Sequence, residues 1–303
     1  MFMPIASPVN GESRIRDYTM PSYDPGDGHR LYYEDRGAGR PLVLLHGWAC
    51  HAGYFAPQAE ALAARFRVVV PDLRGHRHSH RAGDAPTLAT LADDLRGLIA
   101  AAGLASPVLV GWSMGAMVAF EYARRFGTDD LGGLVVVDMT ARVVNDAEWR
   151  LGLLGGYRAS QAERAPAIIR RDWPRWVEAF LPTVLAAGGP GNPALLDWIA
   201  GEMQGCDPDT MAALWRDLTA ADYRRDVGRI ALPALILRGE RSQLYGPDTA
   251  AWLAGAIAGA EIAVVADAGH APHLEQPAAF NRALVAFVER IDPAPPAEIA
   301  SGR

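Results

Sequence analysis

Short apolar runs alternate with stretches of helical periodicity along most of the chain. Seven runs have the length of a strand, and they occupy residues 30–35, 41–47, 66–72, 107–113, 131–138, 232–239 and 261–270. Such continuous runs are typical of strands in a parallel sheet that helices cover on both faces. Residues 87–103 carry an apolar stripe at helical spacing and end at a glycine, and residues 114–127 end the same way. The alternation predicts an α/β fold with a mostly parallel, doubly wound sheet.

The alternation stops after Asp138. Residues 139–230 contain no strand-like run, and five of the eight tryptophans fall within them. Glycines and prolines break this region into stretches that favour helices, at residues 147–156, 173–186, 193–205 and 210–228. We therefore predict a helical cap at 139–230, inserted into one discontinuous core formed by residues 17–138 and 231–291. The ends, 1–16 and 292–303, are predicted to be flexible.

Composition narrows the function classes. Half of the 303 residues are hydrophobic, and the net charge of −6 argues against a nucleic-acid-binding surface. The two cysteines, Cys50 and Cys206, are too few for a disulfide framework and wrongly spaced for a metal site. The first 20 residues have neither a basic start nor a sustained apolar stretch, so we expect no signal peptide and no membrane span. A cytoplasmic protein with a small-molecule substrate is the expectation, and its oligomeric state stays open.

A serine between glycines stands where one apolar run gives way to a helical pattern. Gly111, Ser113 and Gly115 fit the motif G-x-S-x-G, and an earlier run ends in the sequence LLHGW at residues 44–48. With these motifs the chain, over about residues 30–291, resembles the α/β-hydrolases, of the cap-bearing serine esterase and lactonase type. The resemblance implies that Ser113 is a nucleophile on a sharp turn. It also implies that the backbone amides of Trp48 and Met114 form an oxyanion hole.

The same resemblance selects the base. His270 ends the last apolar run, follows the serine in the expected chain order, and matches the family's final histidine. His273 is the rival, and His46 is assigned to loop structure. Three alternating histidines lie in one loop without matching acidic or cysteine ligands, so we predict a solvated surface there and no metal: His76, His78 and His80. No cofactor is expected.

Two departures from the family pattern are visible. The usual D-x-R-G-x-G-x-S motif is matched at four positions, but Arg77 replaces its second glycine and adopts positive φ less easily. The second departure concerns the acid, because Ser242 occupies the place where relatives carry an aspartate. Some members of the family place the acid one strand earlier, and the resemblance therefore implies Asp138, at the end of the run 131–138, as the preferred acid. Glu240 and Asp248 are fallbacks, and Asp267 lies too close to its histidine along the chain.

The resemblance implies a mainly apolar or aromatic ester, thioester or lactone as substrate. The predicted contacts are Trp48, Trp112 and, from the cap, Trp149. The cap arginines Arg158 and Arg171 are candidates for meeting a carboxylate or phosphate carrier. Two other functions stay open: a cofactor-independent oxygenase of the same fold, in which Ser113 positions the substrate without being acylated, and a receptor that binds its ligand without turnover.

Overall fold

The computed structural model describes residues 21–187 and 192–291. The predicted flexible ends, 1–16 and 292–303, lie outside the described residues. Among the described residues, no helix is both long and apolar enough to cross a lipid bilayer.

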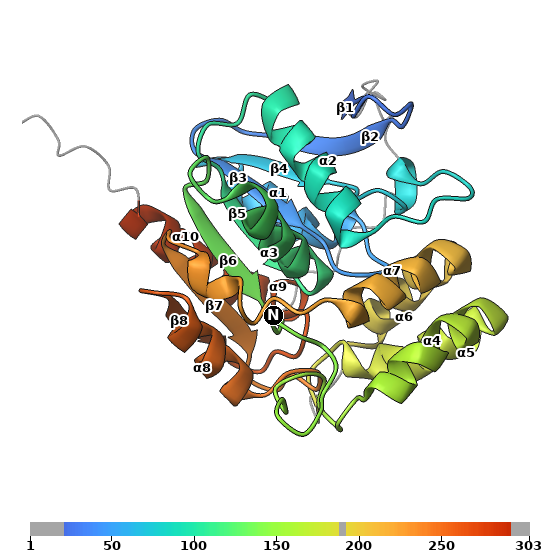
Figure 1. The fold of residues 1–303 in the computed structure, drawn as a ribbon. Coiled ribbons are helices and arrows are strands. Elements are labelled where there is room, and N and C mark those ends of the chain that lie inside the picture. Colours follow the sequence, from blue (N-terminus) through green and yellow to red (C-terminus); the bar gives the residue numbers. More distant parts are fainter. Residues whose placement is uncertain (1–20, 188–191, 292–303) are drawn as a thin grey trace, which may run out of the picture.

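One eight-stranded sheet runs through the molecule (Figure 1). Its strands lie in the order β1-β2-β4-β3-β5-β6-β7-β8. The first two strands pair antiparallel, β2 pairs antiparallel with β4, and all later pairs are parallel. The strands are β1 (Ser22–Tyr23), β2 (Leu31–Arg36), β3 (Pro41–Leu45), β4 (Arg67–Pro71), β5 (Val108–Trp112), β6 (Gly133–Val137), β7 (Ala234–Gly239) and β8 (Glu261–Val265). The predicted α/β fold with a mostly parallel sheet is confirmed, and β1 is a short addition to the seven expected strands.

Helices cover both faces of this sheet (Figure 1). On one face α1 (Ala56–Leu62) contacts α10 (Pro277–Ile291), and on the other α2 (Leu88–Ala101) contacts α3 (Met114–Phe126). This cover explains why every residue of β3, β5 and β6 is buried. The remaining helices outside the insertion are α8 (Pro247–Ala256), the short α9 (Pro272–Glu275) and the 3₁₀ turns η1 (Ala52–Phe55) and η2 (Arg77–Ser79); a further 3₁₀ turn, η4 (Val227–Arg229), ends the insertion.

Strand β8 differs from the buried strands that its apolar sequence led us to expect. It lies at the edge of the sheet, with β7 as its one partner strand in the described part of the chain. Ile262 is 46% exposed and Val264 is 53% exposed. The apolar run was therefore a correct indication of a strand but a wrong indication of burial.

Four helices between β6 and β7 lie beside the ends of the central strands (Figure 1). They are α4 (Ala159–Arg171), α5 (Trp173–Phe180), which continues into η3 (Leu181–Thr183), α6 (Pro193–Gln204) and α7 (Pro208–Ala220). We call them the cap helices. The helix expected at 147–156 is absent, so that prediction is wrong. The Asn145 side chain accepts from the Gly152 amide and donates to the Leu153 carbonyl, which holds this segment as a loop.

Candidate active site

Ser113 lies on the sharp turn between β5 and α3. Its φ of 53° is in the left-handed region, which a serine adopts only under strain. A Cβ at Gly111 would lie 2.5 Å from the backbone of Ala116, and one at Gly115 would lie 2.2 Å from the Leu45 carbonyl oxygen. Only glycine therefore fits at these two positions. Because Gly111 and Gly115 have no side chain, α3 can start directly against β5 and the end of β3.

Asp138 and His270 meet although 132 positions separate them in the chain. Asp138 follows β6 with a φ of 45°, and His270 follows β8. The His270 Nδ1 donates to Asp138 Oδ2 over 2.7 Å, and both side chains are buried. Because an ionised carboxylate only accepts, this bond fixes the proton on Nδ1 and leaves Nε2 as the acceptor nitrogen.

The Ser242 hydroxyl completes this cluster. It donates to the same Asp138 Oδ2 over 2.6 Å, while the amides of Leu244 and Tyr245 donate to Ser242 Oγ over 3.3 and 3.4 Å. Ser242 therefore contacts the carboxylate from the position where relatives carry their own acid. Sequence reasoning noticed this serine but did not predict its bond to Asp138.

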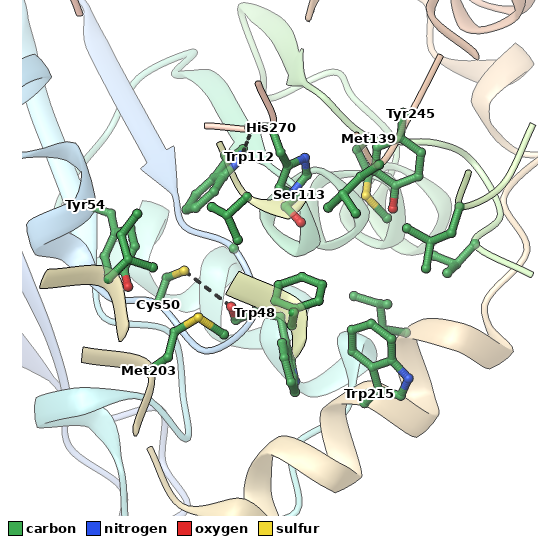
Figure 2. Close-up of a pocket in the computed structure, with 18 residues that line it drawn as sticks. Trp48, Cys50, Tyr54, Trp112, Ser113, Met139, Met203, Trp215, Tyr245 and His270 are labelled. Carbon is green, nitrogen blue, oxygen red and sulfur yellow. Dashed lines mark hydrogen bonds between the residues drawn. The ribbon is translucent and has the colours of Figure 1, made fainter. Parts of the chain in front are cut away.

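Ser113 and His270 line one buried cavity between the sheet and the cap helices (Figure 2). In the close-up, Tyr54 lies toward one end, Tyr245 toward the other, and Ser113 with His270 between them. Three cap helices, α5, α6 and α7, and the residue after η3 border this space, through Phe180, Val184, Ile199, Met203, Trp215 and Leu218. None of the described residues that line the cavity is an Asp, Glu, Lys or Arg. The cavity is thus suited to an uncharged, mainly apolar molecule.

The loop after β3 brings Trp48 to the cavity opposite the start of α3. Among the turns, loops and helix caps of the described chain, no backbone hydrogen bond uses the amide of Trp48 or that of Met114 as its donor. His46 fixes this loop: its Nδ1 donates to the Gly47 carbonyl over 2.8 Å and its Nε2 accepts from the Leu73 amide over 2.9 Å. Burial holds the pKa of His46 well below its usual range, so the ring is neutral, as these two bonds require.

The three tryptophans predicted to meet substrate have different positions. The Trp48 indole donates to the Met211 carbonyl over 3.0 Å, and the Trp112 indole donates to the His270 carbonyl over 2.7 Å; both line the cavity. Trp149 does not. Its indole bonds the Arg142 carbonyl and packs edge-on against Trp252, away from Ser113. Trp149 is thus buried within the loop at 147–156 and does not line the cavity, so nothing in the structure supports its predicted contact with substrate.

The other candidates lie away from the cluster. His273 packs against Phe55 and Trp112, and burial lowers its pKa to about 3. The three alternative acids, Glu240, Asp248 and Asp267, are all exposed. The cap arginines Arg158 and Arg171 are also exposed and do not line the cavity. Within the described residues, no group of three or more His, Cys, Asp or Glu could hold a metal ion.

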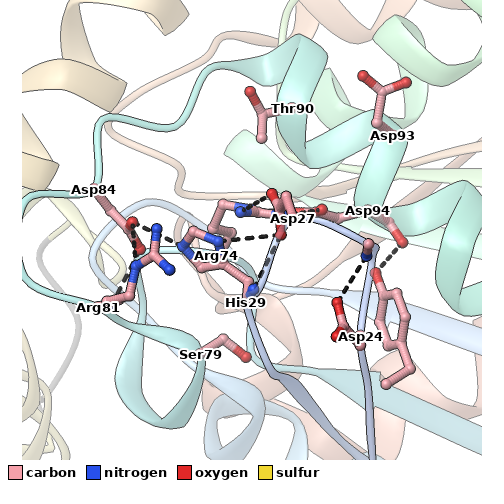
Figure 3. Close-up of polar contacts among 12 residues, drawn as sticks. Asp24, Asp27, His29, Arg74, Ser79, Arg81, Asp84, Thr90, Asp93 and Asp94 are labelled. Carbon is pink, nitrogen blue, oxygen red and sulfur yellow. Dashed lines mark hydrogen bonds and ion pairs between the residues drawn. The ribbon is translucent and has the colours of Figure 1, made fainter.

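The loop at residues 72–79, whose motif differs from the family pattern at Arg77, still has positive φ at that position. Arg77 has a φ of 44° and pairs with Glu202 of α6. Arg74 anchors the same loop: it is buried, binds Asp94 with two bonds of 2.7 Å and contacts Asp27 over 2.7 Å (Figure 3). Ser79 accepts from the Tyr32 amide over 2.9 Å. These contacts give the motif a structural role in tying the loop to β2 and α2.

Sequence reasoning missed a carboxylate that holds the His270 loop. Glu275 accepts from the Gly269 amide over 2.6 Å and from the Ala186 amide over 2.7 Å, which joins the loop to the segment after η3. Burial raises its pKa, against the lowering effect of the two bonds. It lies five residues after His270 in a short helix that the sequence pattern does not reveal.

Comparison with known proteins extends this picture. Residues 42–283 match the model of the Alpha/beta hydrolase family. The chain is 33% identical over 262 residues to the pimeloyl-[acyl-carrier protein] methyl ester esterase of Chromobacterium violaceum, an alignment that covers 86% of this chain and 98% of the relative.

Two solved structures resemble the chain with similar TM-scores and sequence identities. A thermophilic esterase from Thermogutta terrifontis has a TM-score of 0.78 and 28% identity, with 90% of this chain and 97% of that one covered. The enol-lactonase from Burkholderia xenovorans has a TM-score of 0.76 and 26% identity, with 88% and 99% covered.

Proposed function

Since the chain belongs to the alpha/beta hydrolase family, as its family match and the relatives above establish, we propose that it is a carboxylic ester hydrolase that acts through an acyl-enzyme on Ser113. The observation that carries the proposal is the contact of His270 with Asp138 at 2.7 Å beside a cavity that also exposes Ser113. The resemblance drawn from the sequence is thereby confirmed at the level of the family.

The proposed first half-reaction forms the acyl-enzyme. His270 Nε2 takes the proton of the Ser113 hydroxyl as its oxygen attacks the ester carbonyl carbon. The carbonyl oxygen becomes an oxyanion, which the amides of Trp48 and Met114 stabilise, with help from the N-terminus of α3. The tetrahedral species then collapses, and the proton on Nε2 passes to the departing alcohol.

The second half-reaction repeats these steps with water. His270 Nε2 takes a proton from water as the water oxygen attacks the acyl carbon. The tetrahedral species then collapses, the proton on Nε2 passes to Ser113 Oγ as its bond to the acyl carbon breaks, and the acid is released. Throughout, Asp138 accepts from Nδ1, keeps the ring in the productive tautomer and stabilises the imidazolium that forms twice per turnover. Ser242 holds the carboxylate for this role.

The lining of the cavity indicates a class of substrates and does not single out one compound. Its lining by Trp48, Trp112, Trp215 and aliphatic side chains, without a charged residue, favours an uncharged ester with apolar or aromatic arms. Esters and lactones share the reacting carbonyl group, and relatives named for each are similar to this chain. We propose residues 139–230 as the cap that closes over this substrate.

A panel of p-nitrophenyl esters of increasing acyl length tests the function. We expect hydrolysis that saturates with substrate in the wild type and a loss of at least a thousandfold in kcat for Ser113→Ala. Turnover no better than in Ser113→Ala at every length would overturn the proposal. In that case oxygen uptake with a heteroaromatic substrate would indicate the oxygenase, and tight binding without turnover would indicate the receptor.

A further inference from the structure

Tyr54 presents a hydroxyl group that the proposed mechanism does not use. It lies in η1 and lines the same cavity as Ser113. The side chain is fully buried, and its hydroxyl has no nitrogen or oxygen partner among the described residues; its hydrogen-bonding neighbour is the Cys50 thiol, a weak acceptor. A buried hydroxyl whose one protein partner is a weak sulfur acceptor is poorly satisfied, so a ligand oxygen that accepts its hydrogen gains a stronger bond.

Neighbouring rings hold Tyr54 in place. Its ring stacks on Trp112, packs on Trp198 and meets His51 edge-on. The distances between the ring centroids are 5.8, 4.6 and 5.1 Å, respectively. The nearby Cys50 thiol gives its own hydrogen to the Trp48 carbonyl over 3.3 Å. The hydroxyl is therefore fixed mainly by aromatic packing, with the Cys50 thiol as a weak polar neighbour, and such a rigid donor needs no reordering when a ligand arrives.

The surroundings of the hydroxyl set the chemistry of its partner. Ile199 and Met203 from α6 give the cavity apolar walls, and no Lys or Arg side chain lines it within the described residues. A carboxylate would be buried there without a counter-ion, at a high desolvation cost. Burial raises the pKa of Tyr54, so the phenol stays protonated and acts as a donor.

We propose that Tyr54 is a specificity-determining residue that donates a hydrogen bond to a neutral acceptor oxygen on one arm of the substrate, away from the reacting ester. The acceptor is a ketone, an ether or a second ester oxygen. This inference rests on the proposed ester hydrolase function and narrows its substrate class, from apolar esters in general to esters with one such oxygen in the arm that reaches Tyr54.

Matched ester pairs test the proposal by turnover. One series carries a ketone at successive carbons of the acyl arm and a second carries it along the alcohol arm, each beside its all-methylene twin. In the wild type we expect at least one keto ester to exceed its twin about tenfold in kcat/KM. Tyr54→Phe should bring this ratio close to one. As a control, Tyr122→Phe changes an equally buried tyrosine of α3 that pairs with Asp130 and does not line the cavity, and it should keep the wild-type ratio.

Binding to a variant without the nucleophile separates this proposal from the proposed function. The same pairs are titrated calorimetrically into Ser113→Ala with Tyr54 present or replaced by Phe, and the ratio of the two Kd values is compared. A keto preference that needs Tyr54 supports the inference even if the wild type hydrolyses nothing, which would overturn the hydrolase proposal alone. Hydrolysis of all esters with no keto preference in either assay, or a preference that survives Tyr54→Phe, overturns the role of Tyr54 alone.

Discussion

Two residues at strand ends carry the chemistry that we propose, and both have positive φ values. Ser113 and Asp138 have φ of 53° and 45°, in a region where strain persists only if the surroundings enforce it. Ser113 is held by the close approach of α3, and Asp138 by its amide, which donates to the Leu237 carbonyl over 2.8 Å. The turn at Asp138 directs its carboxylate to His270, and the turn at Ser113 places this residue at the cavity that His270 also lines.

Asp138→Asn tests the choice of acid. The amide would keep the size of the side chain but could not hold the His270 tautomer or stabilise its imidazolium, so we expect kcat to fall about 10³–10⁴-fold with a normal fold. Ester hydrolysis and circular dichroism check this. Near-normal turnover in Asp138→Asn together with inactivity of Glu240→Gln would show that the acid is elsewhere.

Ser242 is expected to act through Asp138 rather than through substrate. Removing its 2.6 Å bond in Ser242→Ala frees the carboxylate to turn, and a hydrogen bond to a charged group contributes about 1.5–3 kcal/mol. We expect kcat to fall about tenfold or more while KM changes less than twofold. Ser242→Thr retains a hydroxyl and should recover most of the rate. If the Ala variant had the wild-type kcat, the serine would be only a turn residue.

At the scale of elements, the His270 loop is joined to the segment after η3. A Cβ at Gly269 would lie 2.3 Å from the backbone of Leu185, and the Ala271 amide donates to the Val184 carbonyl over 3.2 Å. The cap side of the cavity and the base therefore share one packed contact, which couples their positions.

Gly269→Ala should break this contact. The methyl group has no space against the Leu185 backbone, and overpacking of this kind costs about 1–3 kcal/mol. We expect the melting temperature to fall by several degrees and kcat/KM by at least tenfold. Gly255→Ala is the matched control, because its Cβ meets nothing within 4 Å on α8. Equal activity of the two variants would contradict the coupling.

The sequence predicted the elements better than the contacts between them. The strands and the G-x-S-x-G turn follow from local periodicity and from glycines that pack without Cβ atoms, and these are properties that neighbouring residues determine. The loop at 147–156 was misread because its conformation depends on Asn145 bonding across it. Likewise, the partners of Ser242 and Glu275 and the packing of Tyr54 against Trp112 and Trp198 arise from distant segments, which no single-sequence pattern reports.

For the whole molecule, buried neutral histidines set a pH dependence of stability. Burial lowers the pKa of His273 to about 3, that of His76 to about 4, and that of His46 well below its usual range. In the unfolded chain each has a pKa of about 6.5. Between these values the unfolded state binds more protons, so stability is lost as pH falls from about 6.5 toward 3–4.

His273→Phe isolates one of these groups. The ring lies among Phe55, Trp112 and Phe280, where phenylalanine is compatible with the packing. Each histidine contributes a slope of about 1.4 kcal/mol per pH unit between its two pKa values. Urea unfolding at pH 6, 5 and 4 should show a slope lower by about that amount in the variant. An unchanged slope would mean that His273 binds its proton in the folded state.

The most direct test of the central claim is mass spectrometry of the protein after treatment with a fluorophosphonate, which traps an activated serine. We predict a single adduct that peptide mapping assigns to Ser113, formed at least a thousandfold more slowly in His270→Ala. Failure of Ser113 to react in the wild type, or an equal labelling rate in His270→Ala, would contradict the claim that His270 activates Ser113.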